Sequence, residues 1–281
     1  MIFMNKNKEI AIKEIEEKES MIVEVADKIW NFAELSLNEY KSCELYCSIM
    51  EKEGFEVRKG ISGIATAFMA SFGSGKPVIG VLAEYDALSG IPKCDVSKKE
   101  HLDVKKLENS ITSGSSAHGC GHNLLGAGAM AAALGIKKYL EDSHHKGTVI
   151  LFGCPGEEGC ASKAFFARDG VWKDVDAALT WHPADCNEVV TGSSNSCIQV
   201  KYTFKGVSSH ASAAPEKGRS ALDAVELMNI GVQFLREHMS DKARVHYAIT
   251  DAGGVSPNVV QSKAEVLYMV RSNHVKEALE L

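Results

Sequence analysis

The stretch Val78-Ile79-Gly80-Val81-Leu82-Ala83-Glu84-Tyr85-Asp86 places an unbroken apolar run directly before two acidic residues. A short apolar run bounded in this way is typical of a buried strand. The run Thr148–Phe152 has the same character and is followed by turn residues 153–156 and then by Glu157 and Glu158. Both patterns predict acidic side chains just beyond the carboxyl ends of buried strands.

A third apolar run, residues 177–181, ends immediately before His182. Open α/β sheets place their functional sites at the carboxyl edge of the strands, so we expect these polar residues to converge there. The segment His118-Gly119-Cys120-Gly121-His122-Asn123 adds a thiol and an imidazole only two residues apart. An extended or turning loop can aim Cys120 and His122 at one point, whereas a helix would separate them.

These residue types indicate a site for a divalent metal ion. A thiolate with imidazoles favours zinc, and a neighbouring carboxylate also admits manganese or cobalt, so the metal identity stays open. Of two adjacent carboxylates, one can bind metal while the other acts as general base. Each residue also has a simpler interpretation. A single His or Cys is usually packed or solvated, paired carboxylates suit a helix N-terminus, and Asp86 suits a turn.

The last third of the chain predicts a second domain. Residues 198–205 alternate between apolar and polar, which is typical of a half-buried strand. A helix with a broad apolar face follows at 219–239, and two further strand patterns appear at 245–249 and 266–270. This β-α-β-β order begins a ferredoxin-like unit, which a further helix and strand would complete. The predicted domains are 1–194 and 195–281.

Composition narrows the class of protein. The chain has 281 residues, 45% of them hydrophobic, and no apolar run approaches the length of a membrane span. A net charge of −6 with dispersed basic residues argues against nucleic-acid binding through a basic patch. No signal peptide is evident, and the eight cysteines are expected to remain thiols. We therefore expect a cytoplasmic protein that binds neither membrane nor nucleic acid.

Several longer motifs occur in order along nearly the whole chain. They are Glu84-Tyr85-Asp86-Ala87-Leu88, His118-Gly119-Cys120-Gly121-His122-Asn123, Glu157-Glu158, Trp181-His182-Pro183, Ser208-Ser209-His210-Ala211-Ser212 and Gly253-Gly254-Val255-Ser256-Pro257-Asn258. Together they resemble the co-catalytic metallopeptidases and amidohydrolases, a family that includes aminoacylase, bacterial glutamate carboxypeptidases and plant auxin-conjugate hydrolases. One branch of that family has cysteine for the bridging aspartate in a His-X-Cys-Gly-His-Asp motif. This chain departs from that motif by Asn123 in place of aspartate.

The resemblance implies a centre of two divalent metal ions, zinc, manganese or cobalt, in the complete enzyme. Cys120 would bridge the ions, and the further ligands are implied to be His122, Glu158 and His182. Glu157 would be the general base. Asp86 would orient a ligand imidazole, and Glu84 stands where many relatives have a ligand histidine.

The resemblance also assigns roles to the smaller domain, which mediates dimerisation in the family. It implies that His210 reaches the active site of a partner and holds the oxyanion. Asn258 and Arg271 resemble substrate-binding positions, since an arginine matches a substrate carboxylate. Relatives return to the catalytic domain after this domain and supply a final ligand histidine there. We therefore expect this chain, which stops at Leu281, to be truncated at its C-terminus.

The expected fold is α/β, a metallopeptidase catalytic domain with a mixed sheet flanked by helices, plus an incomplete ferredoxin-like α+β dimerisation, or lid, domain. Within the family, the Asn123 variant most resembles the B-subunit branch, which hydrolyses p-aminobenzoyl-glutamate to p-aminobenzoate and glutamate. The expected partners are a small N-acyl amino acid substrate and either a second copy of the chain or a companion A-type chain. A dipeptidase or another N-acyl amino acid hydrolase of the same family is an alternative.

Two hypotheses from other classes remain. In a cysteine hydrolase, Cys120 would be a nucleophile activated by His118 or His122, but the acidic pair and His182 would then have no natural role. In a binding or structural remnant, the incomplete fold would keep the ligand loop without assembling two metals or turning over substrate. Resistance of activity to chelators would favour the first hypothesis. Metal binding without hydrolysis would favour the second.

Overall fold

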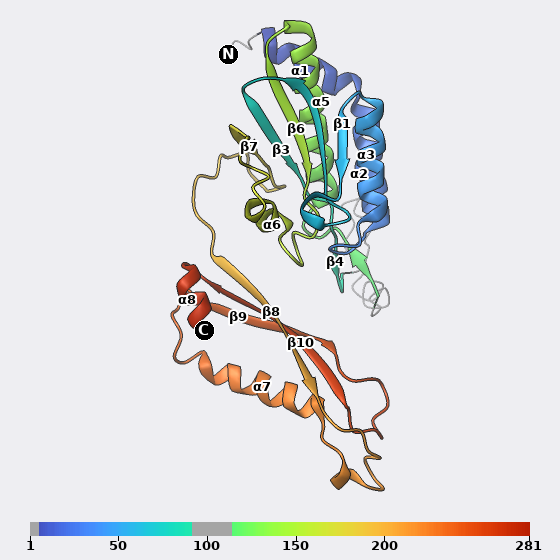
Figure 1. Ribbon diagram of the computed structural model, residues 1–281, viewed down its shortest axis with the longest axis vertical. Helices are drawn as coiled ribbons and strands as arrows, with labels where there is room; N and C mark the ends of the chain where they lie inside the picture. Colours follow the sequence, from blue (N-terminus) through green and yellow to red (C-terminus); the bar gives the residue numbers. More distant parts are fainter. Residues whose placement is uncertain (1–5, 92–113) are drawn as a thin grey trace. The chain divides into compact units, whose positions relative to one another are not determined.

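The computed structural model describes residues 6–91 and 114–281 (Figure 1). The chain divides into two compact units, Met1–Asn187 and Glu188–Leu281, called unit 1 and unit 2. The boundary expected from the sequence falls slightly later, after residue 194. Residues 188–195 contain neither helix nor strand, so the first regular element of unit 2 begins at Ser196.

Unit 1 is built around a five-stranded mixed sheet. Its strands are β1 (Glu56–Lys59), β2 (Phe68–Ser74), β3 (Val78–Ala83), β6 (Gly147–Gly153) and β7 (Ala177–Leu179). They lie in the order β1-β2-β6-β3-β7. Strand β3 is parallel to β6 and β7, whereas β2 is antiparallel to β1 and β6. The expected mixed sheet is confirmed, and the three apolar runs of the sequence form its parallel part.

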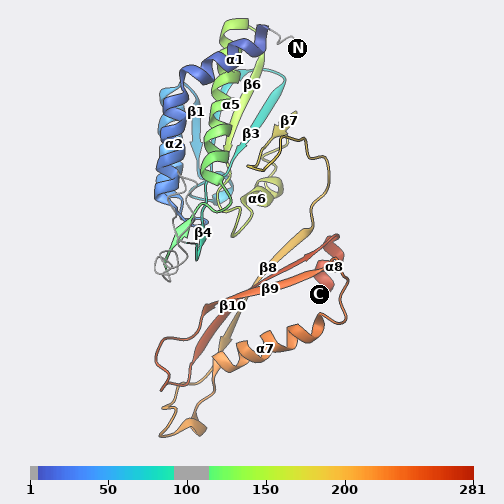
Figure 2. The ribbon, with the colours of Figure 1, turned by 180° about the vertical axis from the view of Figure 1, so that it is seen from behind.

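Helices cover both faces of this sheet. They are α1 (Lys6–Glu17), α2 (Glu19–Phe32), α3 (Tyr40–Lys52), α5 (His122–Ser143) and α6 (Ser162–Arg168), with a short 3-10 helix, η1 (Ile61–Gly63). Figure 2 shows α1, α2 and α5 in front of the strands, and α6 lies toward the opposite face in Figure 1. The N-terminal chain turns at Lys18, which separates α1 from α2.

Strands β3 and β6 are almost entirely apolar because their successive side chains enter two different cores. On β3, Val81 and Ala83 belong to the core beneath α2, α3 and α5, while Leu82 belongs to the core beside α6. On β6, Leu151 and Phe152 separate in the same way. Complete burial of one such large apolar side chain contributes about 1.5–3 kcal/mol to folding.

The carboxyl ends of the parallel strands β3, β6 and β7 meet at one edge of the sheet. Strand β4 (Leu88–Ser89) pairs beyond this edge with β5 (Ser116–Ala117), which brings the following segment, with Cys120, into the region. Helix α5 then begins at His122. The prediction of a loop for both ligands is therefore wrong for His122, because the chain enters the helix between the two residues.

Unit 2 is a three-stranded antiparallel sheet with one long helix. Its elements are β8 (Ser196–Lys205), the 3-10 helix η2 (Pro215–Lys217), α7 (Ala221–Leu235), β9 (Arg244–Asp251), β10 (Lys263–Ser272) and α8 (Val275–Glu280). The strand order is β8-β10-β9, and Ser220 caps α7 by accepting a hydrogen bond from the N–H of Asp223 at 3.0 Å. This β-α-β-β arrangement agrees with the expected incomplete ferredoxin-like domain.

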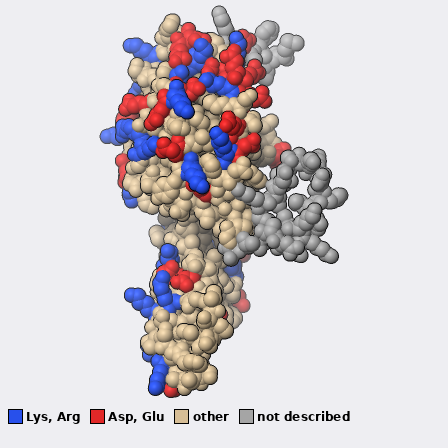
Figure 3. All heavy atoms as spheres, turned by 90° about the vertical axis from the view of Figure 1, so that its right-hand side faces the viewer, with Lys and Arg blue, Asp and Glu red and all other residues tan. Residues whose placement is uncertain are grey.

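The surface carries charges of both signs. In Figure 3, Lys and Arg side chains are interspersed with Asp and Glu over the visible face of unit 1. Among the described residues, no helix is both long enough and apolar enough to cross a membrane.

Candidate metal centre

His122 lies at the centre of the polar cluster at the sheet edge. It is 1% exposed, and its Nδ1 donates a hydrogen bond to Oδ1 of Asp86 at 2.9 Å. This bond fixes the tautomer and leaves the lone pair on Nε2. Nε2 is buried and makes no hydrogen bond among the described residues, although Oε2 of Glu84 lies 3.1 Å from it. A buried imidazole nitrogen of this kind is suited to binding a metal ion.

Asp86 ties three segments of the chain together. Its Oδ2 accepts hydrogen bonds from Oγ of Ser36 at 2.7 Å and from the N–H of Glu158 at 2.9 Å. Burial opposes ionisation, but the hydrogen bonds from His122, Ser36 and the Glu158 backbone hold the pKa of Asp86 below its ordinary value. The Asp86 carboxylate in turn raises the pKa of His122, although burial acts in the opposite direction.

Cys120 and His182 complete one candidate ligand group. The Sγ of Cys120 lies 3.1 Å from Nε2 of His182. Nδ1 of His182 lies 3.1 Å from the carbonyl oxygen of Pro183, so donation from Nδ1 again leaves the lone pair on Nε2. One ligand atom from each of Cys120, His122 and His182 lies within 4.8 Å of the others.

Trp181 fixes the position of the neighbouring His182. Its Nε1 donates to the carbonyl oxygen of Leu125 on α5 at 3.0 Å. Its ring also lies against Gly128, where a Cβ atom would come within 2.8 Å of the indole. This contact fastens the segment after β7 to the helix that begins with His122.

The paired carboxylates after β6 have different surroundings. Oε1 of Glu158 is buried and has no hydrogen-bond partner among the described residues. The Glu157 side chain is 41% exposed, and its Oε2 lies 3.9 Å from Nε2 of His122. Burial, followed by the charges of Glu84 and Glu158, raises the pKa of Glu157. One carboxylate is thus enclosed, and the other reaches solvent.

The surroundings of Cys120 do not favour an independent nucleophile. Burial and the nearby Glu158 carboxylate raise the pKa of its thiol to about 12, so a thiolate forms readily only if a cation binds beside it. His118 offers no activation, because its Nε2 lies 3.0 Å from the carbonyl oxygen of Ile29 and its ring stacks with Trp30. The cysteine-hydrolase hypothesis therefore loses one of its two proposed bases.

A second possible ligand group shares His122. It consists of Glu84, His122 and Glu157, again with one ligand atom each within 4.8 Å. Glu84 is 6% exposed and forms an ion pair with Lys163 of α6. The charge of Glu84 raises the pKa of Lys163, although burial acts against it. No sequence motif pointed to Lys163, which lies outside all of them.

Glu39 is a second residue that the sequence did not single out. It is fully buried, and its Oε1 accepts a hydrogen bond from the N–H of Gly156 at 2.8 Å. Its other oxygen accepts from Thr66 at 2.9 Å. Glu39 thus anchors the turn that carries Glu157 and its neighbour, and burial raises the pKa of the Glu39 carboxyl.

Asn123, the departure from the expected motif, has a structural role. Its Nδ2 donates a hydrogen bond to the carbonyl oxygen of Ala26 on α2 at 3.3 Å. An aspartate carboxylate could not donate this bond. The amide therefore suits a buried position against the neighbouring helix α2.

The predicted residues of unit 2 fall into two places. His210 and Asn258 lie on exposed neighbouring loops, where His210 forms a backbone bridge with Val259. Arg271 pairs in register with Cys197 near the start of β8, at the opposite end of the sheet. At about 3.3 Å per residue, roughly 25 Å of strand separates Arg271 from the loop end. Unit 2 therefore does not bring these three side chains together.

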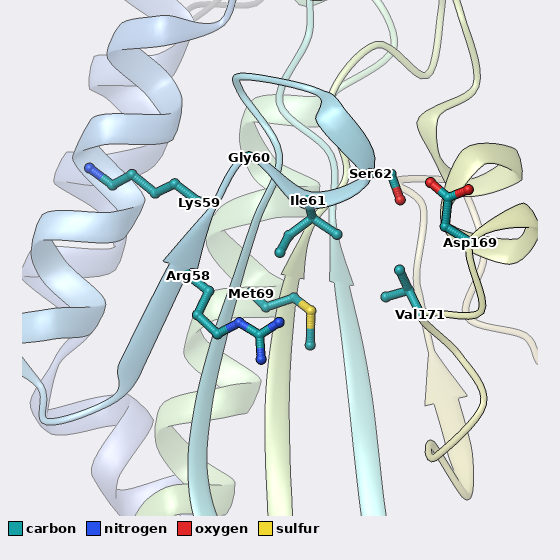
Figure 4. Close-up of a pocket in the computed structure, with 8 residues that line it drawn as sticks. All are labelled: Arg58, Lys59, Gly60, Ile61, Ser62, Met69, Asp169 and Val171. Atoms are coloured by element: carbon teal, nitrogen blue, oxygen red, sulfur yellow. The ribbon is translucent and has the colours of Figure 1, made fainter.

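A separate pocket lies beside β1 and η1 (Figure 4). Its volume is about 490 Å³, and it shares no residue with the cluster around His122. Its lining includes Arg58, Ile61, Met69 and Asp169. The pocket therefore lies outside the candidate metal centre.

Residues 193–281 match the M20 peptidase dimerisation domain. Over 258 residues the chain is 48% identical to the p-aminobenzoyl-glutamate hydrolase B subunit of Escherichia coli (strain K12), in an alignment that covers 92% of this chain and 52% of that protein. The chain is thus similar to M20 peptidases, and its last third matches their dimerisation domain. It is also 29% identical over 280 residues to the Xaa-Arg dipeptidase of Mus musculus, covering 95% of this chain and 58% of that protein. The chain thus spans about half the length of the curated relatives it matches.

Solved structures share the fold. An aminobenzoyl-glutamate utilization protein from Klebsiella pneumoniae aligns with a TM-score of 0.61 at 17% identity, covering 95% of this chain and 70% of that one. A dinuclear metal-binding peptidase of the M20 family from Bacillus subtilis aligns with a TM-score of 0.54 at 20% identity, covering 94% and 67%.

Proposed function

We propose that the protein is a metal-dependent amidohydrolase that cleaves the amide bond of an N-acyl amino acid. The observation that carries this proposal is the buried Nε2 of His122, which makes no hydrogen bond among the described residues and shares a ligand group with Cys120 and His182. The first substrate to test is p-aminobenzoyl-glutamate, because the Escherichia coli relative is named for its hydrolysis. The products would be p-aminobenzoate and glutamate.

The donor set fits a divalent metal centre. Cys120, His122 and His182 would hold the metal, and the buried free oxygen of Glu158 would add a carboxylate ligand. Thiolate and imidazole suit zinc or cobalt, and the carboxylate also admits manganese. We propose two such ions, in keeping with the Bacillus subtilis neighbour described as dinuclear. When bound, they would supply Lewis acidity toward the amide carbonyl and the attacking water.

Glu157 has the properties of the proton carrier. Its side chain reaches solvent beside the ligand group, and burial together with Glu84 and Glu158 raises the pKa of its carboxyl. A carboxylate of raised pKa accepts a proton from water more readily and remains able to release it to the departing amine. We therefore propose Glu157 as general base and then general acid.

Asp86 acts through His122 rather than on the substrate. Its carboxylate accepts from Nδ1 and so keeps Nε2 available and the ring fixed. The same carboxylate holds the backbone of Glu158, so one residue orients both an imidazole and a carboxylate ligand. We propose Asp86 as a positioning residue.

The two polar regions of unit 2 suggest different tasks. We propose that exposed His210 acts on the active site of a partner chain, where its ring would stabilise the oxyanion and Asn258 would contact substrate. Arg271 is separated from both by roughly 25 Å of strand. If Arg271 binds a substrate carboxylate, it would therefore serve a different site from the one served by His210 of the same copy.

The dimerisation domain supports an oligomer as the working form. We propose either a homodimer or a heteromer with a companion chain, because curated relatives include both the B-type and the A-type subunits of p-aminobenzoyl-glutamate hydrolase. The proposed location is the cytoplasm.

The test compares Glu157→Gln with the unchanged protein in metal content and in release of p-aminobenzoate. We expect turnover to fall by about 10²–10⁴-fold, because proton transfer is lost, while bound metal stays equal. Glu56→Gln, at an exposed position on β1, is the matched control and should match the unchanged protein. Full activity of Glu157→Gln would refute the general-base role. Absence of both metal and hydrolysis in the unchanged protein would refute the proposed function.

A further inference from the structure

An ion pair between Glu84 and Lys163 lies inside the polar cluster. Glu84 follows β3 and is almost fully buried, and Lys163 projects from the first turn of α6 with 32% of its side chain exposed. Nζ of Lys163 contacts Oε1 of Glu84. An enclosed carboxylate needs such a partner, because burial of an unpaired charge is strongly unfavourable.

The other oxygen of Glu84 faces the imidazole. Oε2 lies 3.1 Å from Nε2 of His122, and Oε2 of Glu157 lies 3.9 Å from the same nitrogen. Two carboxylates and one imidazole form a donor set richer in oxygen than the group with Cys120. Such a set favours hard cations such as Mn²⁺, whereas a thiolate favours softer ions such as Zn²⁺.

Two metal ions cannot bind His122 at the same time. Its Nδ1 is bonded to Asp86, so Nε2 carries the one lone pair of the ring that is available to a metal. An ion bound at Nε2 can therefore take its further ligands mainly from Cys120 and His182 or mainly from Glu84 and Glu157. The charges beside the two groups decide which set of ligands the ion prefers.

We propose that Lys163 is a specificity-determining residue of the metal centre, because its ammonium group occupies Glu84 and so directs a cation at His122 to the Cys120 side. The ammonium takes one carboxylate oxygen and cancels its charge. It also repels a second positive charge placed a few ångströms away on Glu84. The inference rests on the metal centre of the proposed function but not on its hydrolytic activity.

The test uses metal-free protein and two probe ions. Co²⁺ bound by a thiolate gives a sulfur-to-metal charge-transfer absorption, which reports ligation by Cys120. Mn²⁺ binding is followed by electron paramagnetic resonance of the free ion. Lys163→Met removes the charge at similar length, Lys163→Arg retains it, and the double variant Lys163→Met with Glu84→Gln removes both charges.

We expect the unchanged protein and Lys163→Arg to show the full thiolate band with the first equivalent of Co²⁺. In Lys163→Met this band should weaken at one equivalent, and Mn²⁺ should bind about tenfold more tightly, because the freed Glu84 carboxylate now attracts the ion. The double variant should return to the unchanged behaviour, since it has neither the ammonium nor the extra carboxylate. Thermal unfolding followed by circular dichroism identifies any variant that fails to fold.

Three outcomes would overturn the proposal. The first is a folded Lys163→Met protein that matches the unchanged protein with both ions. The second is a loss of the thiolate band in Glu84→Gln alone, which would make Glu84 a ligand beside Cys120. The third outcome uses Lys163→Gln, a further variant that removes the charge, and also decides the case where Lys163→Met does not fold. It is an Mn²⁺ affinity of Lys163→Arg equal to that of Lys163→Gln. Absence of a thiolate band in every protein would instead refute the Cys120 ligand of the proposed function, while the Mn²⁺ comparison still tests Lys163.

Discussion

The central polar side chains of the candidate site in unit 1 are buried, whereas the candidate residues His210 and Asn258 of unit 2 are exposed. In unit 1, Asp86 and His122 are each about 1% exposed and are held by hydrogen bonds from several segments. In unit 2, His210 and Asn258 lie on exposed loops, and the ring of His210 accepts hydrogen bonds only from nearby backbone N–H groups, at 3.2 Å, among the described residues. The first arrangement is rigid by itself. In the proposed function, the second would act only when a partner chain covers it.

This contrast separates two kinds of contribution to the proposed hydrolysis. Changes at the buried cluster should alter metal binding, because the ligands there depend on each other. Changes at the exposed loops should alter turnover without altering metal content or folding. Each variant below tests whether the two units divide the work in this way.

The largest effect is expected for His122→Ala. It removes the shared ligand atom of both possible groups, so we expect stoichiometric metal binding and hydrolysis to be lost. His246→Ala, at an exposed position on β9, is the matched control and should retain both. Metal content after dialysis, measured by atomic emission, decides the result. Retention of metal by His122→Ala would show that the cluster around His122 is not the metal site.

The next effect is expected for His210→Ala. If its ring stabilises the oxyanion in a partner's site, turnover should fall by about 10²–10³-fold while metal content stays unchanged. Mixing this variant with inactive Glu157→Gln should restore part of the activity, because mixed dimers combine one intact copy of each residue. A loss of metal in His210→Ala, or no recovery on mixing, would contradict the division between the units.

A smaller effect is expected for Asp86→Asn. The amide can still accept a hydrogen bond but no longer carries the charge that orients His122, so metal affinity should fall by about 10–100-fold. Ser36→Ala removes a different hydrogen bond to the same carboxylate and should reduce affinity less. Competition with a chromogenic chelator measures both. Equal affinities for Asp86→Asn and the unchanged protein would show that the orientation of His122 does not depend on this charge.

The smallest effect concerns stability. A Cβ atom at Gly126 of α5 would lie 2.6 Å from the carbonyl oxygen of Glu84, so Gly126→Ala should destabilise unit 1 by about 1–3 kcal/mol. Gly231 of α7 has open space around it, and Gly231→Ala should be neutral or stabilise unit 2 by about 0.5–1 kcal/mol.

Tryptophan fluorescence during urea denaturation reports unit 1 selectively, because the three tryptophans of the chain are Trp30, Trp172 and Trp181. The fluorescence midpoint should therefore fall for Gly126→Ala and stay constant for Gly231→Ala. A rise of the fluorescence midpoint in Gly231→Ala would mean that the two units unfold as one.

The parallel strands and the candidate cluster were predictable because local chemistry determines them. The apolar run Val78–Ala83 forms β3 with the same bounds, and the polar residues after it lie at the expected edge. Helix α5 was not predicted, and its first residue, His122, was assigned to a loop. It is rich in glycine and alanine and packs against α1, α2 and the sheet, so its apolar residues do not form a single stripe.

The sequence patterns could not predict contacts between residues far apart in the chain. Lys163 reaches Glu84 across 79 positions from a helix outside every motif, and no local signal marks such a pair. The separation of Arg271 from His210 likewise depends on the register between β8 and β10, which the alternation of each strand alone does not determine.

The attachment of Trp181 to α5 has a consequence for the rate of metal exchange. His122 is enclosed and fixed, whereas His182 is exposed and follows Trp181, whose indole packs against Gly128. In the proposed metal centre, His182 would therefore be the imidazole that leaves the ion first. Entry and release of metal would then proceed through the solvent side of β7, at a speed set by how often the indole detaches from the helix.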